Sequence, residues 1–322
     1  MTARPPAVVV SSDRPGAAVA LIRAAHPDLA VHSCTTYGGL AALIEDTGAE
    51  VVFCDRFAPG PYPRAALVES GVRWVGVSGS GTDHLSPWDT SRVTVTNAAG
   101  VAAGMMAEYA LGAMLAFSLD HAGFHRARAE RRWKHDGFVQ PIEGRTLLIV
   151  GLGHTGLAAA RRARAMGLTV LAVRAWPAPS AEVDEIRGID ALPSLLPRAD
   201  FLLVCVPLTR ATRGLIGADA LALLPPHAVL IDVSRGGVVD QTALAGALAS
   251  GRLKGAALDV FETEPLPPES PLWALENVIL TPHCSSVYPG WFEKSARVFS
   301  DNLGRWRRGE PLLNIVDPAR GY

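Results

Sequence analysis

The stretch that decides the fold is residues 145–174, R-T-L-L-I-V-G-L-G-H-T-G-L-A-A-A-R-R-A-R-A-M-G-L-T-V-L-A-V-R. Its apolar run over residues 147–150 predicts a strand, and glycines at G-x-G-x-x-G spacing follow directly. An Ala/Arg-rich segment that stops at Gly167 predicts a helix, and the apolar run over residues 169–173 predicts a second strand. A strand, a glycine turn, a helix and a strand in this order are typical of dinucleotide binding.

Each glycine of the turn has its own physical role. Gly151 permits a tight turn, Gly153 lets the backbone approach a pyrophosphate, and Gly156 lets the helix pack closely on the strand. The helix N-terminus, at His154 and Thr155, offers free N–H groups and the positive end of the helix dipole to phosphates. We therefore predict that these five residues bind a nicotinamide dinucleotide.

Arg174 bears on which dinucleotide is bound. It lies 18 residues after Gly156 (174 − 156), at the end of the second strand. An acidic side chain there would accept hydrogen bonds from a ribose 2′-OH, whereas an arginine suits a 2′-phosphate. The sequence therefore favours NADP(H), with NAD(H) possible if Arg174 is only a solvated surface residue.

The bulk composition restricts the class of protein. A chain of 322 residues, 49% hydrophobic and 19% charged, is long enough for two globular domains. No apolar run approaches the ~18 residues of a membrane span, and the N-terminus lacks the pattern of a signal peptide. The net charge of −1 suggests no nucleic-acid or membrane-surface partner, so we expect a cytoplasmic protein. The four cysteines, none in a C-x-x-C pair, are expected to be buried free thiols without a metal.

Strand-like and helical segments alternate along both halves of the chain, which predicts mostly parallel sheets covered on both faces. The strand-like runs outside residues 145–174 are 7–10, 31–34, 51–55, 72–77, 93–96, 201–206, 229–233, 256–260 and 278–280. Residues 97–118 indicate a loop that leads into a long helix, and the more polar residues 119–144 indicate a connection or protruding arm. Near the C-terminus, five apolar side chains at spacings of three and four predict one packed helix: Phe292, Ala296, Phe299, Leu303 and Trp306.

Four polar stretches follow predicted strands. The glycine-rich loop V-S-G-S-G-T-D-H, residues 77–84, is either a simple turn or a site whose N–H groups hold a carboxylate. Arg235 and His283 each follow a strand, while Asp259 is expected inside a strand and Glu264 on the loop beyond it. Because ligands bind at the carboxyl ends of parallel strands, Arg235, Glu264 and His283 are expected at the cofactor edge.

These residue types suit the reduction of a ketone by hydride transfer. A protonated histidine can donate to the carbonyl oxygen, and a carboxylate on its other nitrogen orients the ring. An arginine can fork onto a substrate carboxylate. Taken singly, each residue could instead be an ordinary loop charge.

Five motifs carry a resemblance to a known family: G-L-G-H-T-G (151–156), P-L-T-R-A-T-R-G-L-I (207–216), V-S-R-G-G-V-V-D (233–240), A-A-L-D-V-F-E-T-E-P-L-P (256–267) and T-P-H (281–283). With them the chain resembles the D-isomer-specific 2-hydroxyacid dehydrogenases, close to the glyoxylate/hydroxypyruvate reductase branch. The resemblance implies that Arg235, Glu264 and His283 are catalytic and that the backbone of Gly79 and Ser80 binds the substrate carboxylate. Asp259 would contact the nicotinamide amide. The resemblance also implies four residues that line the cofactor site: Val206, Pro207, Thr212 and Ser234.

The resemblance also implies a domain arrangement. Two Rossmann-like or flavodoxin-like α/β domains with doubly wound parallel sheets are expected. The NAD(P)-binding domain, residues 98–283, is inserted in a substrate-binding domain formed by residues 1–97 and 284–322. Family members are usually homodimers, with the arm at residues 119–144 in the interface. Many members carry an aspartate where this chain has Arg174, and this departure again favours NADP(H).

Three alternatives share the fold. A formate-type dehydrogenase would pair glutamine with the histidine, so Glu264 argues against it. A phosphite-type dehydrogenase keeps a similar set of three residues and stays open. A non-enzymatic, dinucleotide-sensing corepressor also stays open, although this chain lacks long disordered extensions. The sequence leaves the 2-oxoacid unspecified, and we expect the loop at residues 55–62 and Trp291 to determine it.

Overall fold

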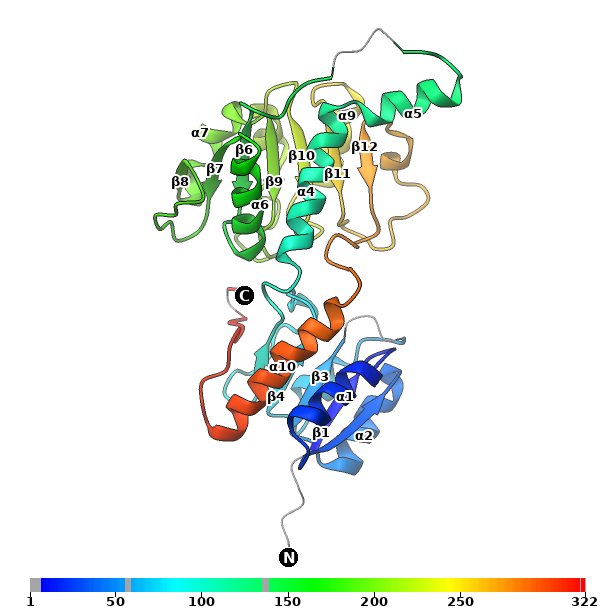
Figure 1. Cartoon of the computed structure of the whole chain (residues 1–322), viewed down its shortest axis with the longest axis vertical. Helices are drawn as coiled ribbons and strands as arrows, with labels where there is room; N and C mark the ends of the chain where they lie inside the picture. The colour runs from blue at the N-terminus through cyan, green and yellow to red at the C-terminus, as the bar shows by residue number, and fades with distance from the viewer. Residues whose placement is uncertain (1–6, 56–58, 135–138, 319, 322) are drawn as a thin grey trace, which may run out of the picture. The chain divides into compact units, whose positions relative to one another are not determined.

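The computed structural model describes residues 7–55, 59–134, 139–318 and 320–321, and Figure 1 shows the whole chain. The chain divides into two compact units, which we call unit 1 (Met1–Val101 with Tyr288–Tyr322) and unit 2 (Ala102–Val287). Each unit contains a parallel sheet with helices on both faces, so the predicted α/β, doubly wound class is confirmed. That the units act as substrate and cofactor domains stays a prediction.

Unit 1 is built on a five-stranded sheet of order β2-β1-β3-β4-β5, in which every pairing is parallel. The strands are β1 (Ala7–Ser11), β2 (Ala30–Cys34), β3 (Val51–Cys54), β4 (Trp74–Val77) and β5 (Thr94–Thr96). Alternate side chains of these strands enter two separate cores. Val8, Val10 and Phe53 join one core, while Val9 and Val52 join the other. This alternation is the two-residue period of a sheet that is buried on both faces.

The helices of unit 1 divide between these two faces. They are α1 (Gly16–Ala25), α2 (Leu40–Thr47), α3 (Arg64–Val68) and α10 (Trp291–Arg308). Helices α1 and α10 cover one face, and α2 and α3 cover the other. The apolar stripe predicted near the C-terminus is confirmed, because Ala296, Phe299 and Leu303 of α10 are buried against the strands of this unit.

Unit 2 is built on a seven-stranded parallel sheet of order β12-β11-β10-β9-β6-β7-β8. The strands are β6 (Thr146–Val150), β7 (Thr169–Val173), β8 (Glu185–Arg187), β9 (Phe201–Val204), β10 (Val229–Asp232), β11 (Gly255–Leu258) and β12 (Val278–Leu280). Asp259 was expected inside a strand, which is wrong because β11 ends one residue before it. The short edge strand β8 was not expected, since E-I-R has no apolar run to reveal it.

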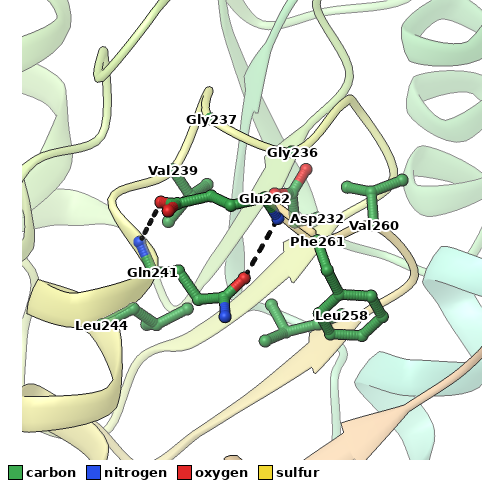
Figure 2. Close-up of a pocket in the computed structure, with 10 residues that line it drawn as sticks. All are labelled: Asp232, Gly236, Gly237, Val239, Gln241, Leu244, Leu258, Val260, Phe261 and Glu262. Carbon is green, nitrogen blue, oxygen red and sulfur yellow. Dashed lines mark hydrogen bonds between the residues drawn. The ribbon is translucent and has the colours of Figure 1, made fainter. Parts of the chain in front are cut away.

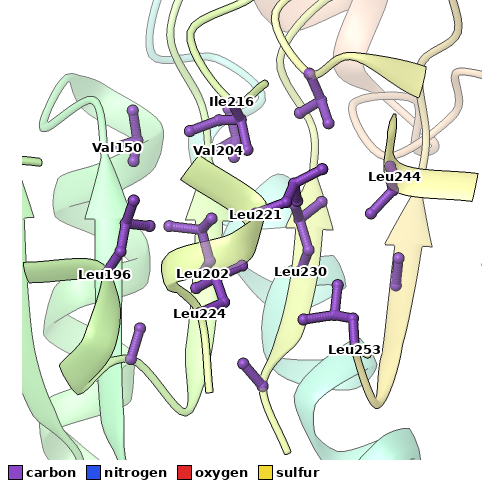
Figure 3. Packing of buried hydrophobic residues seen from close by; sticks show 14 of the residues in the cluster. Val150, Leu196, Leu202, Val204, Ile216, Leu221, Leu224, Leu230, Leu244 and Leu253 are labelled. Atoms are coloured by element: carbon purple, nitrogen blue, oxygen red, sulfur yellow. The ribbon is translucent and has the colours of Figure 1, made fainter. Parts of the chain in front are cut away.

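Helices also cover both faces of the sheet of unit 2 (Figure 1). They are α4 (Ala103–Ser118), α6 (His154–Ala165), α7 (Leu192–Leu195), α8 (Ala218–Leu223) and α9 (Gln241–Ala249), whereas α5 (His121–Ala129) projects beyond the sheet. Helices α4 and α6 pack on one face with Leu147 and Ile149, and α7, α8 and α9 pack on the other with Leu148 and Val150. Figure 3 shows leucine, valine and isoleucine side chains of this second core.

The polar segment expected as an arm contains helix α5. The helix begins after Asp120, whose carboxylate accepts a hydrogen bond from the Gly123 N–H at 3.2 Å. Residues 135–138 of this segment lie outside the described residues, as do residues 56–58 of the loop expected to determine specificity. No helix in the described part of the chain is long and apolar enough to span a membrane.

The four cysteines are free thiols, but they are not all buried. Cys54 is buried, Cys34 and Cys205 are partly exposed, and Cys284 is exposed. The expectation of burial is therefore wrong for Cys284, which lies in the loop beyond β12 rather than in a strand.

Candidate active site

The glycine turn between β6 and α6 has the geometry that phosphate binding requires. Gly151 has φ 106°, a conformation that favours glycine, and a Cβ there would lie 2.9 Å from the Cys205 carbonyl oxygen. A Cβ on Gly156 would lie 2.2 Å from the Gly151 oxygen, so only glycine allows this helix to approach the turn. A Cβ on Gly153 would meet nothing within 4 Å, which leaves this backbone open to a ligand. The residues present therefore fit a dinucleotide pyrophosphate at the N-terminus of α6.

Three side chains fix this turn and the start of α6. The Cys205 thiol donates to the Gly151 carbonyl at 3.0 Å. Burial raises the pKa of Cys205 to about 12, so the thiol stays protonated and keeps this donor. Thr155 directs its hydroxyl at the sulfur of Met106 in α4, 3.6 Å away, while His154 is exposed.

The loop after β9 carries three of the residues expected to line the cofactor site. Val206, Pro207 and Thr212 are all half-buried. The Thr212 hydroxyl donates to the Pro207 carbonyl at 2.7 Å and accepts from the Thr209 N–H at 2.8 Å. These two bonds hold the loop in a closed turn, because the Thr212 hydroxyl contacts the backbone of both Pro207 and Thr209.

Arg174 lies directly beyond β7 and is half-buried. Its N–H donates to the carbonyl of Arg187 in the neighbouring strand β8 at 3.1 Å. Within the described part of the chain, no carboxylate lies within 4 Å of its guanidinium, whereas nearby Arg187 and Arg198 both pair with Glu185. Arg174 therefore keeps its positive charge uncompensated at this end of the strand.

The structure brings Glu264 and His283 together. Strands β11 and β12 are neighbours, and the two side chains extend from the loops beyond them. Glu264 Oε2 lies 2.8 Å from His283 Nδ1, and Glu264 Oε1 accepts from the Phe261 N–H at 3.0 Å. Both side chains stay partly accessible, at 30% and 23%. The carboxylate is thus fixed by backbone on one side and orients the imidazole on the other.

Asp259 anchors the segment that carries His283. Its carboxylate, 1% exposed, accepts from the Thr281 hydroxyl at 2.6 Å and from the N–H groups of Cys284 and Ser285, both at 2.9 Å. His283 itself has φ 52°, in the left-handed region that non-glycine residues seldom adopt. Asp259 therefore holds the loop on both sides of a strained histidine, and its contact with nicotinamide stays a prediction.

Arg235 lies on the loop beyond β10, the next strand of the same sheet. Its Nη1 donates to the Ser234 carbonyl at 2.7 Å. A Cβ on Gly236 would lie 1.8 Å from the Phe261 carbonyl oxygen, so the arginine loop packs directly on the loop that leads to Glu264. Arg235, Glu264 and His283 thus extend from the same edge of three adjacent strands.

A small pocket lies behind this loop (Figure 2). Gln241 and Glu262 bridge it, because each backbone N–H donates to the other residue's side chain at 3.2 Å. The pocket volume is about 10 Å³, room for about one water molecule. It is therefore too small for a substrate or a cofactor.

The glycine-rich loop of unit 1 presents backbone donors. The carbonyl of Gly79 accepts from the Ala98 N–H at 2.9 Å, and the carbonyl of Ser80 accepts from the Asn97 side chain at 2.7 Å. Ser78 before them donates its hydroxyl to the buried Asp55 at 2.8 Å. Within the described residues, no acceptor takes the N–H groups of Gly79 and Ser80, so both are available to an anion.

Two residues that shape the site were missed in the sequence. Asp232 accepts from the N–H and hydroxyl of Ser234, and the signal was a carboxylate at the end of the buried run V-L-I-D. Asn97 fixes the Ser80 loop from 17 positions away. No local pattern reveals such a contact, because it depends on the pairing of β4 with β5.

Three comparisons place the chain among known proteins. Residues 111–285 match the model of the D-isomer specific 2-hydroxyacid dehydrogenase, NAD binding domain. A glyoxylate reductase from Korarchaeum cryptofilum is 36% identical over 255 residues, 76% of each chain.

Two solved structures are similar over nearly the whole chain. A D-isomer specific 2-hydroxyacid dehydrogenase from Xanthobacter autotrophicus, in complex with NADPH and MES, is 35% identical with a TM-score of 0.84, covering 99% of this chain and all of the other. An NADPH-dependent glyoxylate/hydroxypyruvate reductase from Sinorhizobium meliloti, in complex with NADP and sulfate, is 26% identical with a TM-score of 0.80 at the same coverage. With the family model matched over more than half of its length, this chain belongs to the D-isomer-specific 2-hydroxyacid dehydrogenases, a family of NAD(P)-dependent oxidoreductases.

Proposed function

We propose that this chain uses NADPH to reduce a small 2-oxoacid of the glyoxylate or hydroxypyruvate type to the D-2-hydroxyacid, and catalyses the reverse reaction. The observation that carries the proposal is the 2.8 Å contact between Glu264 Oε2 and His283 Nδ1 beyond adjacent strands. The names of the relatives from Korarchaeum cryptofilum and Sinorhizobium meliloti support this class of substrate.

His283 acts as the acid and base in this proposal. With Nδ1 directed at Glu264, its Nε2 faces the substrate and donates a proton as negative charge grows on the carbonyl oxygen. In the direction of oxidation the same nitrogen accepts the hydroxyl proton. Glu264 stabilises the imidazolium and holds the ring, while its other oxygen stays on the Phe261 N–H.

The substrate carboxylate is assigned to two kinds of donor. Arg235 binds the carboxylate with a planar guanidinium and polarises the carbonyl beside it. The N–H groups of Gly79 and Ser80 are a second set of anion donors that we assign to substrate binding. Their carbonyls are held by Ala98 and Asn97, so the donors are fixed before a substrate arrives.

The cofactor in this proposal is NADPH, which supplies the hydride when bound. The turn at Gly151, Gly153 and Gly156 holds the pyrophosphate, and Arg174 binds the 2′-phosphate. Support comes from the lack of any carboxylate within 4 Å of Arg174 in the described part of the chain, and from similar structures solved with NADPH or NADP. Val206, Pro207, Thr212 and Ser234 line the remainder of the cofactor site.

We assign the region of α5 to a homodimer interface. Phe124 of this helix and Trp133 beyond it are 41% and 83% exposed, a large apolar area for one short segment. Sedimentation of the purified chain tests the assignment. A Trp133→Glu variant that stays as large as the wild type would contradict it.

A panel of substrates with both cofactors tests the activity. Glyoxylate, hydroxypyruvate and pyruvate are mixed with NADPH or NADH, and the loss of absorbance at the nicotinamide band is followed. We expect turnover of at least one 2-oxoacid and a higher kcat/KM with NADPH. Binding of NADPH without turnover of any 2-oxoacid would favour the sensor alternative, and oxidation of phosphite with NADP⁺ would favour the phosphite-type dehydrogenase.

A further inference from the structure

Asp232 is a buried carboxyl group that the proposed reaction does not use. It is the last residue of β10, a strand paired on both sides with β9 and β11. Its side chain is almost fully buried, at 3% exposure, and it lies three residues before Arg235. A charge so placed is costly unless hydrogen bonds satisfy its oxygens.

The carboxylate holds the residue next to Arg235. Asp232 Oδ1 accepts from the Ser234 N–H at 2.9 Å and also from the Ser234 hydroxyl at 2.5 Å. This bond from a side chain to the N–H two residues later sets the direction of the chain as it leaves the strand. The Ser234 carbonyl in turn accepts from Arg235 Nη1 at 2.7 Å. A chain of hydrogen bonds therefore leads from the buried carboxylate to the guanidinium.

The loop has little freedom to rearrange once this chain is formed. Gly236 lies directly on the Phe261 carbonyl, with no room for a Cβ. Asp232, Gly236 and Phe261 all line the pocket behind the loop, whose small volume leaves no space for another side chain (Figure 2). The orientation of Ser234 thus sets the position of Arg235.

We propose that Asp232 is a positioning residue, whose ionised carboxylate holds Ser234 and thereby presents Arg235 to the carboxylate of the 2-oxoacid. The inference rests on the proposed function, because it assumes that Arg235 binds this substrate. Protonation of Asp232 replaces charge-assisted hydrogen bonds by weaker neutral ones, so the arginine is less well fixed. Affinity for the 2-oxoacid therefore falls as Asp232 takes up a proton.

The groups around Asp232 set the pH at which its carboxylate takes up a proton. Burial raises the pKa of Asp232 to about 7, Asp259 raises the pKa further, and the Ser234 bonds and Arg235 lower it. The other titratable groups that face it, Cys205 and Tyr109, both have a pKa of about 12 and stay neutral. Protonation of Asp232 therefore lowers the affinity for the 2-oxoacid at low pH.

The experiment compares the wild type with Asp232→Asn, a variant of the same shape that accepts the Ser234 bonds without ionising. Initial rates with NADPH and the best 2-oxoacid give kcat and KM between pH 5.5 and pH 9. For the wild type we expect KM to rise about tenfold from pH 8 to pH 6, as for one group with a pKa near 7. In Asp232→Asn we expect a high KM that no longer depends on pH in this range. Asp240→Asn is the matched control in the same loop, because asparagine also caps α9, and its profile should follow the wild type.

A second measurement separates this inference from the proposed function. Binding of oxalate, a carboxylate that cannot be reduced, to the NADPH-saturated protein is measured by calorimetry over the same pH range. Oxalate affinity that falls below pH 7 in the wild type but not in Asp232→Asn supports the role of Asp232, even if no 2-oxoacid is turned over. A wild-type KM and oxalate affinity that do not change between pH 8 and pH 6 would overturn it, as would an Asp232→Asn profile identical to the wild type. Absence of both turnover and oxalate binding overturns the inference together with the proposed function.

Discussion

The imidazole of His283 has one nitrogen directed at Glu264 and sits on a backbone in the left-handed region. Replacing His283 by alanine should lower kcat by about 10²- to 10⁴-fold, the usual contribution of a positioned acid. NADPH binding should remain, because the glycine turn lies in a separate loop after β6. Steady-state rates and the quenching of protein fluorescence by NADPH measure the two effects. Cys284→Ala is the control at an exposed neighbour, and an unchanged rate in His283→Ala would refute the acid/base role.

Arg174 carries the cofactor prediction. An aspartate at this position would repel a 2′-phosphate and accept hydrogen bonds from a ribose 2′-OH instead. We therefore expect Arg174→Asp to lower kcat/KM for NADPH by at least about tenfold, roughly the energy of one charge-assisted hydrogen bond, and to spare NADH. Arg187→Asp on the next strand is the control, because that arginine already pairs with Glu185. An equal loss of kcat/KM with both cofactors would show that Arg174 does not distinguish a 2′-phosphate from a 2′-OH.

Asp232 also predicts how stability depends on pH. Its pKa is raised to about 7 in the folded chain, above the value of about 4 in an unfolded one. The unfolded chain therefore loses this proton first as pH rises, and stability falls between about pH 4 and pH 7. Asp232→Asn removes the penalty, so its free energy of unfolding should exceed the wild type's at pH 8, by on the order of 4 kcal/mol. At pH 4 the two should agree, and urea titrations at both values check this. A variant less stable than the wild type at pH 8 would contradict it.

Individual residues were predictable where a local rule fixed them. Gly151 and Gly156 follow from the spacing of the turn, and their crowded surroundings confirm why no other residue fits. Asp259 was expected inside a strand, but it lies just beyond one and binds a loop more than twenty residues away. Its partners depend on the pairing of β11 with β12, which the spacing of residues along the chain does not specify.

Among the elements, α10 makes the clearest packing prediction. Phe299 stacks between Phe53 and Trp74, with ring centroids 4.8 and 4.7 Å away, and is 3% exposed. Phe299→Ala leaves a cavity between α10 and the sheet and should lower the free energy of unfolding by about 3–5 kcal/mol. Arg297→Ala, an exposed change on the same helix, should have little effect. Thermal unfolding followed by circular dichroism compares the two, and equal melting temperatures would contradict the packing.

Strands that consist of an apolar run were predicted correctly, whereas short helices and strands with mostly polar residues were not. Strands β6, β7 and β12 coincide with their apolar runs to within one residue. Strands β6 and β7 are buried on both faces, and the half-buried edge strand β12 is still an unbroken apolar run, V-I-L. Strand β8 was not predicted, because it lies at the sheet edge and its half-buried Glu185 and Ile186 do not form an apolar run. Helix α5 was not predicted either, because it buries only Gly123 and Ala127 and so has no apolar stripe.

At the scale of the whole molecule, the chain crosses between its two units twice, near residues 101 and 288. The alternation of strands and helices predicted both doubly wound sheets. It did not show which sheet the last helix would cover, because a stripe on α10 fits any apolar face; only the family resemblance assigned residues 284–322 to the domain of residues 1–97. In the structure Phe299 and Leu303 are buried in unit 1, so the core of unit 1 includes residues from both ends of the chain.

Unit 2 is one continuous segment of the chain, whereas unit 1 is formed by two segments, so fragments that contain one unit should differ in their ability to fold. Residues 102–287 contain both cores of unit 2 without a contribution from elsewhere, so this fragment should fold cooperatively and bind NADPH. It lacks Gly79 and Ser80 and should reduce no 2-oxoacid.

Residues 1–101 alone lack α10 and leave Trp74 and Phe53 uncovered, so that fragment should aggregate or stay unfolded. Adding residues 288–322 through a short glycine-serine linker should restore it, because the linker replaces only the inserted unit. Circular dichroism melts of the three fragments decide the matter. If residues 1–101 melt cooperatively alone, the last helix is not part of the unit's essential core.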